Sequence, residues 1–466
     1  RNRKPVYSPT MWMGIMAIME DAMFKGKKLL FSICFFIACF PCLVLGAQGD
    51  LDITFNTPNG YTLYKGWNKD SYTGAAIQAD GKILVSTGIK NGADADVGVL
   101  RYNRDGTLDG TFGINGIVTY DGGNGNDCGR LLAIQPNGKI VLTGYTHNGN
   151  NYDILTMRLN VDGSPDSSFG TNGIAVYDNA DRNDKGRGIA IQPDGKILVT
   201  ARSTGGGTSI AMMLRYGAGG VLDDTFGTNG VMSYESDQGN AGFRDVAIQG
   251  DGKIVTSGYT KTIAGYLFLT ARCDNDGTLD NTFGTNGITT YDGGHGSAGA
   301  RGIAVQVDGK IVVSGSNFNG TDLDVLVLRY NSNGTLDSGF GTGGVVTYDG
   351  GKGDDNGRRL ALQEGGRIVV TGNTSDGSNV LVLVLRYNRN GTPDVAFGNA
   401  GKIILQLGEG DDWGESVVIS AKQNIVIAGG VDNSADNDVL VFRLIGFQSG
   451  GGGGSSSGCF IDTVRH

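Results

Sequence analysis

Short apolar runs alternate with polar, glycine-rich segments along most of the chain. In one representative stretch, β-forming residues gather at 116–120, 130–135, 140–144 and 152–159. The Asn-Gly pair at 137–138 is typical of a tight hairpin, because both residue types tolerate the positive φ that such turns need. No segment of useful length repeats its apolar positions with the helical period. The pattern therefore predicts four short β-strands in this stretch and no helix.

The same pattern recurs seven times with a period of 57 residues. An aspartate stands three residues before a phenylalanine in every copy, and an arginine recurs with the same period from Arg101 to Arg443. The marker phenylalanines are Phe55, Phe112, Phe169, Phe226, Phe283, Phe340 and Phe397. A long fixed period of this kind is typical of solenoids, propellers and arrays. The chain therefore contains seven copies of one structural unit.

A unit of four short strands favours a propeller. Four-stranded sheets repeated around an axis form a β-propeller, which leaves only short, protected strand edges. The fourth strand is a nearly continuous apolar run in several units, for example at 380–387, as expected for a strand buried on both faces. An open β-solenoid is the alternative, but its coils are typically much shorter than one unit. We therefore predict an all-β fold, a seven-bladed propeller with four-stranded blades.

Long motifs recur in order within the units and carry a family resemblance. Two clear copies are Leu-Arg-Tyr-Asn-Ser-Asn-Gly-Thr-Leu-Asp at 328–337 and Pro-Asp-Gly-Lys-Ile-Leu-Val at 193–199. Over residues 51–446 the chain resembles the bacterial delta-60 repeat, a β-propeller family. The resemblance implies an exported, often surface-linked protein, and it brings no catalytic residues with it.

The Gly-Lys-Ile strand, present in five of the units, also resembles the second strand of a kelch repeat, and this similarity sets the order of strands in a blade. It places the 130–135 strand innermost, then 140–144 and 152–159, and the first strand of the next unit outermost. The seventh unit ends near Ile445 and lacks an outer strand. An unpaired strand edge invites aggregation. We therefore predict that the N-terminal strand at 61–64 pairs with the seventh unit and closes the ring.

The N-terminal end has the pattern of a secretory signal peptide. With a start at Met23, three lysines (Lys25, Lys27 and Lys28) precede an uncharged apolar run at 29–45, and the chain then turns polar. We expect a secreted or cell-surface protein. The alternative is an uncleaved membrane anchor, because this run could nearly span a bilayer.

Three parts follow from these observations. They are an upstream segment with the signal peptide (1–47), the propeller (48–447) and a Gly/Ser-rich linker with a Cys-Phe-Ile tail (448–466). The tail resembles the glycine-rich ends of exported bacterial proteins, and a disordered end is the alternative. We expect a monomer that meets a membrane only through an uncleaved N-terminal segment or a processed tail.

Composition excludes several classes of protein. Glycine contributes 81 of 466 residues but proline only 8, so the chain is neither collagen-like nor a proline-rich linker. The formal charge of -9, without a basic stripe, argues against a nucleic-acid partner. Three histidines and six scattered cysteines disfavour a histidine-centred metal site, a Ser-His-Asp triad and a disulfide framework.

The recurring arginine and aspartate form the main candidate interaction. The arginine stands near the end of the apolar fourth strand, and the aspartate follows eight residues later. A partly buried guanidinium group needs a partner, which a carboxylate supplies. We interpret the pairs as structural links that pin the loop between blades; a ring of ligand-binding arginines is the alternative. The pairs are Arg101 with Asp109, Arg158 with Asp166, Arg215 with Asp223, Arg272 with Asp280, Arg329 with Asp337, and Arg386 with Asp394.

Two acidic motifs are candidates for a metal site or an acid/base site. The turn at 103–109 resembles half of a calcium loop but lacks the late bidentate glutamate, so we expect no cofactor, with calcium as the alternative. The loops between first and second strands are acidic, most densely at 354–355 and 411–412, but nothing indicates that these pairs act as acid and base. An arginine closes five of these loops: Arg130, Arg187, Arg244, Arg301 and Arg358. Thr73 and Glu415 take that position in two other units.

Ligand specificity is expected where the copies differ most, in the loops between third and fourth strands. Tyr266, Phe318 and Trp413 lie in or beside variable loops and would form a binding surface by stacking on sugars or proteins. We therefore expect a binding or scaffold module for a protein or carbohydrate rather than an enzyme. The alternative is a hydrolase or lyase acting at the central channel on a polysaccharide or lactone. That would need unique polar residues breaking the sevenfold pattern there, and the sequence shows no clear cluster.

Overall fold

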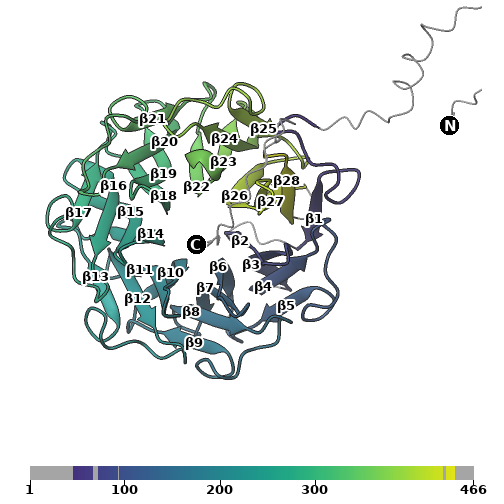
Figure 1. Ribbon diagram of the computed structural model, residues 1–466. Helices are drawn as coiled ribbons and strands as arrows, with labels where there is room; N and C mark the ends of the chain where they lie inside the picture. The colour runs from purple at the N-terminus through teal and green to yellow at the C-terminus, as the bar shows by residue number, and fades with distance from the viewer. Residues whose placement is uncertain (1–45, 67–71, 93, 434–436, 447–466) are drawn as a thin grey trace, which may run out of the picture. The chain divides into compact units, whose positions relative to one another are not determined.

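The structure, a computed structural model, describes residues 46–66, 72–92, 94–433 and 437–446. Within them the chain folds into 28 β-strands and one short 3₁₀ turn, η1 (Glu364–Gly366). The strands form seven four-stranded antiparallel sheets, which Figure 1 shows as blades around a central axis. The predicted seven-bladed, all-β propeller is confirmed.

The blades are numbered in chain order, and their strands run from the axis to the rim. Blade 1 consists of β2 (Gly74–Ile77), β3 (Ile83–Asn91), β4 (Asp94–Tyr102) and β5 (Ile117–Tyr120), and blade 2 of β6 (Cys128–Ile134), β7 (Ile140–His147), β8 (Tyr152–Leu159) and β9 (Ile174–Tyr177). Blade 3 consists of β10 (Asn183–Ile191), β11 (Ile197–Gly205), β12 (Thr208–Tyr216) and β13 (Val231–Tyr234), and blade 4 of β14 (Ala241–Ile248), β15 (Ile254–Thr262), β16 (Gly265–Cys273) and β17 (Ile288–Tyr291).

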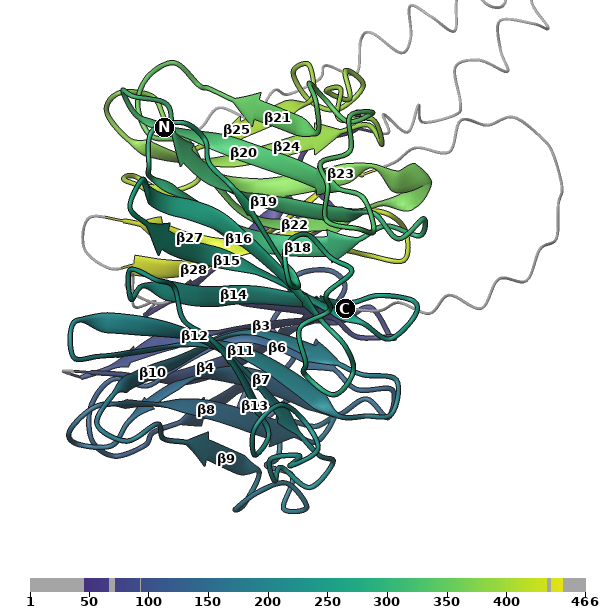
Figure 2. The same ribbon diagram turned by 90° about the vertical axis from the view of Figure 1, so that its left-hand side faces the viewer.

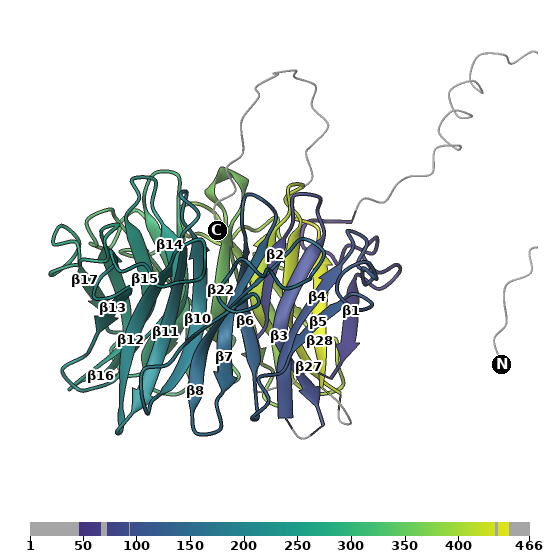
Figure 3. The same ribbon diagram turned by 90° about the horizontal axis from the view of Figure 1, so that it is seen from below.

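Blades 5 to 7 follow the same order. Blade 5 consists of β18 (Ala298–Val305), β19 (Ile311–Phe318), β20 (Leu323–Tyr330) and β21 (Val345–Tyr348), and blade 6 of β22 (Asn356–Leu362), β23 (Ile368–Ser375), β24 (Val380–Tyr387) and β25 (Lys402–Leu405). Blade 7 consists of β26 (Asp412–Ile419), β27 (Ile425–Asp432), β28 (Asn437–Leu444) and β1 (Tyr61–Lys65). The predicted strand order, with the second strand of each unit innermost, is therefore correct. Figures 2 and 3 view the ring from the side and show the strands crossing its thickness.

The N-terminal strand closes the ring. β1 pairs antiparallel with β28, from Tyr61 opposite Phe442 to Lys65 opposite Asp438. Just before β1, the Asp52 carboxylate accepts a hydrogen bond from Arg443 Nε over 2.7 Å. The first and last units therefore share blade 7. This confirms the prediction that the N-terminal strand supplies the outer strand that the seventh unit lacks.

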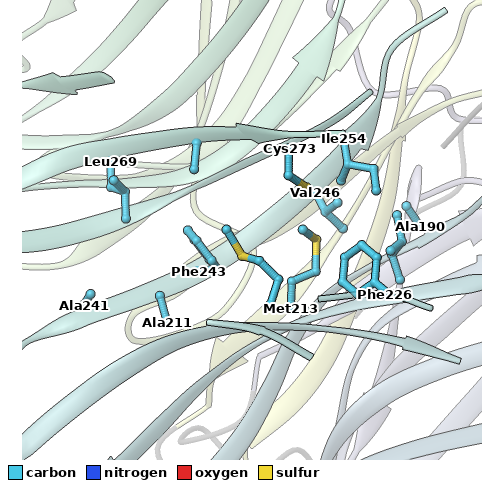
Figure 4. Packing of buried hydrophobic residues seen from close by; sticks show 13 residues of the cluster. Ala190, Ala211, Met213, Phe226, Ala241, Phe243, Val246, Ile254, Leu269 and Cys273 are labelled. Atoms are coloured by element: carbon cyan, nitrogen blue, oxygen red, sulfur yellow. The ribbon is translucent and has the colours of Figure 1, made fainter. Parts of the chain in front are cut away.

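Hydrophobic side chains fill the spaces between neighbouring blades. Figure 4 shows one such cluster, in which Met213 and Phe226 of the third unit pack with Phe243 and Leu269 of blade 4. All seven marker phenylalanines are fully buried. Each aromatic ring fills a wedge that recurs at every blade junction, which explains the constant period of this residue.

The expected signal peptide and the Cys-Phe-Ile tail lie outside the described residues, apart from Gly46 and Ala47. Within the part of the chain that the structure describes, no helix has the length and apolar character needed to cross a membrane.

Candidate functional site

The innermost strand of six blades carries a β-bulge at the same repeat position. In β6 the register against β7 shifts between Gly129 and Leu132, and β10, β14, β18, β22 and β26 shift at the equivalent place. A bulge leaves one residue unpaired and redirects its side chain. The redirected side chains belong to Arg130, Arg187, Arg244, Arg301, Arg358 and Glu415.

Glycine on the adjacent strand makes room for this bulge. A Cβ atom added at Gly144 in β7 would lie 1.9 Å from the backbone oxygen of Cys128 in β6. Four other blades have glycine at the same position, namely Gly258, Gly315, Gly372 and Gly429, and a Cβ atom there would also lie within 2.2 Å of a backbone oxygen. Glycine thus accommodates the bulge in five blades, whereas blade 3 has its bulge with Ala201 at this position.

The redirected side chains line a cavity at the centre of the ring. Tyr72 and Thr73, which precede β2, complete the lining together with Leu131 and Arg359. Every blade thus contributes to one cavity, and six arginines face it. The cluster breaks the sevenfold pattern, because the blade 1 and blade 7 positions carry Thr73 and Glu415 instead of arginine.

Tyr72 is packed among these arginines. The Arg130 guanidinium carbon lies 4.3 Å from the Tyr72 ring centroid, and those of Arg358 and Arg187 lie 5.6 and 5.9 Å away. Burial raises the pKa of Tyr72, but the positive charges of Arg301, Arg187, Arg358 and Arg130 together lower it from 10.0 to about 6. The side chain is therefore largely a phenolate at neutral pH.

Only part of the positive charge has a carboxylate partner. Arg358 lies 3.5 Å from Glu415. Arg359, on blade 6, forms a 2.8 Å ion pair with Asp245 and donates to the Arg244 backbone oxygen on blade 4. Four guanidinium groups have no carboxylate within ion-pair distance among the described residues: Arg130, Arg187, Arg244 and Arg301.

The uncompensated arginines are also partly unpaired as hydrogen-bond donors. Within the described residues, the buried Nε atoms of Arg130 and Arg244 have no acceptor. Burial lowers the pKa of Arg187 and of Arg244, and neighbouring arginines lower both further. An anion in the cavity would satisfy these donors and relieve this repulsion.

Lys185 adds a further positive charge beside the cavity. Its Nζ lies 4.1 Å from the Tyr145 ring centroid and 3.8 Å from that of Tyr152. Burial, followed by the charges of Arg130 and Arg187, lowers the pKa of Lys185 to about 8. This amine is held by aromatic faces rather than by a carboxylate.

The fourth-strand arginines lie elsewhere and have partners of their own. Arg329 Nε donates to Asp337 Oδ2 over 2.7 Å, and its Nη1 donates to the backbone oxygen of Arg389 in the next unit. Its guanidinium carbon lies 4.6 Å from the Phe340 ring centroid. The same aspartate also pairs with Lys310 over 2.6 Å. This geometry links consecutive units and leaves little of the arginine free for a ligand.

The other predicted pairs have the same geometry. Their N–O distances lie between 2.5 and 2.9 Å, in Arg101 with Asp109, Arg158 with Asp166, Arg215 with Asp223, Arg272 with Asp280, and Arg386 with Asp394. In each case the arginine donates to the backbone oxygen 60 residues further on, in the next unit. Arg443 with Asp52 repeats the ion pair across the point of ring closure.

The three aromatic residues singled out in the sequence lie on different blades. Tyr266, in β16, packs edge-on against Tyr259 at 5.7 Å between ring centroids. Phe318 ends β19 and lies 6.3 Å from His295. Trp413, in β26, packs on the hydrophobic cluster between blades 7 and 1. A shared binding surface for the three residues stays a prediction.

The acidic loops have structural explanations. Asp105 Oδ1 accepts hydrogen bonds from the backbone N–H and the hydroxyl of Thr107. It therefore stabilises the 103–109 turn, which in sequence resembles half of a calcium loop. Asp354 accepts a hydrogen bond from the backbone N–H of Leu323, and Asp411 accepts one from that of Val380, each on the preceding blade. A calcium ion in the 103–109 turn stays a prediction.

Three aspartate triads also bring carboxylate oxygens within 4.8 Å of one another. They are Asp96, Asp121 and Asp127; Asp153, Asp178 and Asp184; and Asp324, Asp349 and Asp355. In the first triad Asp127 accepts the Gly122 N–H and Asp96 accepts the Asn91 amide, so both stabilise loops. Burial, and then the charges of its neighbours, raises the pKa of Asp96.

Sequence reasoning identified the loop-closing arginines but did not assign them to the cavity. It also missed Tyr72, Asp245 and Arg359. One sequence signal could have located the cavity: an arginine recurs at the start of the strand that is predicted to be innermost in each blade. Tyr72 gave no repeat signal, because the equivalent residues in blades 2 and 3 are Gly129 and Gly186.

Comparison with known families agrees with the fold. Six stretches match the family described as "Domain of unknown function (DUF5122) beta-propeller", at 78–112, 135–169, 192–226, 249–283, 306–340 and 363–397. The protein is thus a repeat β-propeller, and its units are similar to those of this family. None of the curated proteins matches the sequence.

Solved structures with similar folds have diverse functions. The polysaccharide lyase Uly1 is 10% identical with a TM-score of 0.46, over 80% of this chain and 89% of the other. Drosophila Semaphorin 1b, extracellular domains 1-2, is 11% identical with a TM-score of 0.44, over 85% and 87%. A gluconolactonase from Xanthomonas campestris is 12% identical with a TM-score of 0.35, over 85% and 94%. At these scores the likenesses carry no functional argument.

Proposed function

We propose that this propeller is a binding module that holds an acidic group of a carbohydrate or protein ligand in its central cavity. The observation that carries the proposal is the set of four guanidinium groups that face one cavity without carboxylate partners. Guanidinium groups form strong, charge-assisted hydrogen bonds with carboxylate, sulfate and phosphate oxygens. The ligand is therefore an anion, presented on a larger molecule.

Export fits this role. The lysine-rich start and apolar run at 25–45 favour secretion or display at the cell surface, and the resemblance to delta-60 repeats points the same way. The ligand would then be an extracellular acidic carbohydrate or an acidic protein segment. Tyr266, Phe318 and Trp413 would add contacts that depend on the ligand.

The test is a binding measurement on the full chain with matched variants. Isothermal titration would compare an oligogalacturonate, a sulfated oligosaccharide and a neutral oligosaccharide of equal length. The test variant is Arg187→Gln with Arg301→Gln, which removes two uncompensated charges. The control is Arg389→Gln, because the Arg389 side chain is 56% exposed and lies in a turn.

We expect acidic but not neutral oligosaccharides to bind. The double variant should weaken binding about tenfold or more, since each charge-assisted hydrogen bond is worth about 1.5–3 kcal/mol. The control should bind like the natural chain. Equal binding of neutral and acidic ligands, or unchanged affinity in the double variant, would contradict the proposal.

A lyase acting at the same cavity is the second candidate, and Tyr72 favours it. With a pKa of about 6, Tyr72 is a base at neutral pH, and neighbouring guanidinium groups would offset the carboxylate charge of a uronate. Incubation of polygalacturonate with the protein should then produce chain ends with a new carbon–carbon double bond, detected by ultraviolet absorbance. The product should disappear in Tyr72→Phe; if neither protein forms it, this candidate is excluded for that substrate.

A further inference from the structure

The four uncompensated guanidinium groups approach the axis from four consecutive blades. Arg130 lies on β6, Arg187 on β10, Arg244 on β14 and Arg301 on β18, the inner strands that surround the axis in Figure 1. A carboxylate has two oxygens in one plane and matches one guanidinium fork. A tetrahedral oxyanion directs its oxygens several ways at once. The radial arrangement of donors therefore fits a tetrahedral group better than a planar one.

Charge balance favours the same ligand. Six arginines face the cavity, and two of them have the carboxylate partners Asp245 and Glu415. Four positive charges remain, against one phenolate at most. A phosphate ester, which is largely a dianion at neutral pH, offsets more of this charge than a carboxylate does. A sulfate ester carries a single charge, as a carboxylate does, and is favoured by its geometry alone.

Tyr72 lies among these positive charges, which lower the pKa of its hydroxyl. The charged or titratable groups that line the cavity or couple to its arginines come from six inner strands and one neighbouring strand. They are Arg130 on β6, Lys185 and Arg187 on β10, Arg244 on β14, Tyr259 on β15, Arg301 on β18, Arg358 and Arg359 on β22, and Glu415 on β26. Any second anion in the cavity must share these arginines with the phenolate.

We propose that the cavity binds one tetrahedral oxyanion, the sulfate or phosphate ester of an acidic ligand, between Arg130, Arg187, Arg244 and Arg301, and that Tyr72 takes up a proton as it binds. This inference rests on the proposed function and narrows its ligand. The proton comes from solvent and joins the phenolate oxygen. No covalent bond to the ligand forms.

Proton uptake follows from the electrostatics. In the free protein Tyr72 has a pKa of about 6, so it is mostly ionised at pH 7. The charge of the oxyanion raises the pKa of the phenol, because two like charges in one cavity disfavour the ionised form. Above pH 6 the complex therefore holds more protons than the free protein, and affinity falls as pH rises.

The experiment measures sulfate binding and proton uptake together. Sodium sulfate and sodium acetate are titrated into the full chain from pH 6 to pH 8, in pairs of buffers with different ionisation enthalpies. Sulfate keeps its charge throughout this range, so any pH dependence belongs to the protein. Methyl sulfate and methyl phosphate then distinguish the two ester sources. The variants are Tyr72→Phe and, as a control, Tyr291→Phe in β17, the outermost strand of blade 4.

We expect sulfate to bind about tenfold or more tightly than acetate, with uptake of close to one proton at pH 7. Tyr72→Phe should remove most of the uptake at pH 7 and tighten sulfate binding at pH 8, because the competing phenolate is gone. Lys185, whose pKa is about 8, accounts for the smaller uptake that remains. Tyr291→Phe should leave the proton uptake, the pH dependence and the sulfate affinity unchanged.

Each contrary outcome has a distinct meaning. If acetate or oligogalacturonate binds as tightly as sulfate and depends on Arg187 and Arg301, the oxyanion inference is wrong while the proposed function stands. Sulfate binding without proton uptake overturns the role of Tyr72. If neither inorganic anions nor acidic oligosaccharides bind, both proposals are wrong.

Discussion

Removal of one carboxylate between two units should destabilise the propeller strongly, and Asp337 provides a measurable case. Its oxygen lies 2.7 Å from the Arg329 guanidinium, and the two side chains are only 9% and 6% exposed. Asp337→Ala leaves Arg329 buried without its carboxylate. Loss of one partner of a buried ion pair costs about 3–5 kcal/mol. Lys310, whose side chain is 30% exposed, can reach solvent and adds little to this cost.

The assay is urea-induced unfolding followed by circular dichroism, with Arg329→Met/Asp337→Ala as a second variant. If an unpaired buried charge causes the loss, the double variant should recover part of the stability lost in the single variant. Arg389→Gln is the control, because its pair with Asp308 is exposed and worth about 0–1 kcal/mol. A cost below about 1 kcal/mol for Asp337→Ala would refute the reasoning, since that value is typical of a surface pair.

The same pair gives a pH dependence with a definite sign. Burial raises the pKa of Asp337, but Lys310, the Gly339 N–H and Arg329 lower it more, so the net shift is downward. A carboxyl whose pKa is lower in the folded state stabilises the fold above its unfolded pKa and loses this contribution as pH falls. The natural chain should therefore lose more stability than Asp337→Ala between about pH 5 and pH 3. Equal losses would show that Asp337 is not the group responsible.

Three further predictions follow from the fold and the cavity. Deletion of 48–66 should lower the melting temperature, measured by scanning calorimetry, far more than deletion of 450–466. Only the first deletion removes β1 and so exposes the edge of β28. Equal shifts would contradict closure of the ring through β1. The ultraviolet absorbance of the Tyr72 phenolate is the difference between the natural chain and Tyr72→Phe. In a pH titration this difference should appear near pH 6, and its appearance near pH 10 would disprove the effect of the arginines. Gly144→Ala should cost about 1–3 kcal/mol in urea unfolding, because its Cβ would lie 1.9 Å from a backbone oxygen. Gly219→Ala, which has nothing within 4 Å, should cost far less, and equal costs would contradict this account.

The fold could be predicted because its determinants are local and repeat along the chain. Phe112 and its equivalents are fully buried at every blade junction, so their period reports the junctions directly. Asp109 follows Arg101 by eight residues in the same unit, so the pair is visible in one copy of the motif. Such features appear in sequence as fixed spacings.

The cavity could not be assembled in the same way. Arg130 points to the axis because β6 slips against β7 between Gly129 and Leu132, and a register shift belongs to two strands rather than to a motif. Arg359 and Asp245 meet across two blades, 114 residues apart in sequence. These contacts depend on how the ring closes, and no spacing in the sequence records that geometry.

The arginines of the cavity differ in physical origin from those between blades. Arg329 is needed at its position because Asp337 holds its guanidinium group, which donates to the Arg389 backbone oxygen of the next unit, and every junction needs such a link. A bulge in an inner strand has no comparable need for arginine, as Glu415 in blade 7 shows. Five guanidinium groups at that one repeat position repel one another across the cavity and lower the stability of the fold. Packing does not explain this cost, and an anionic ligand that offsets the charge does.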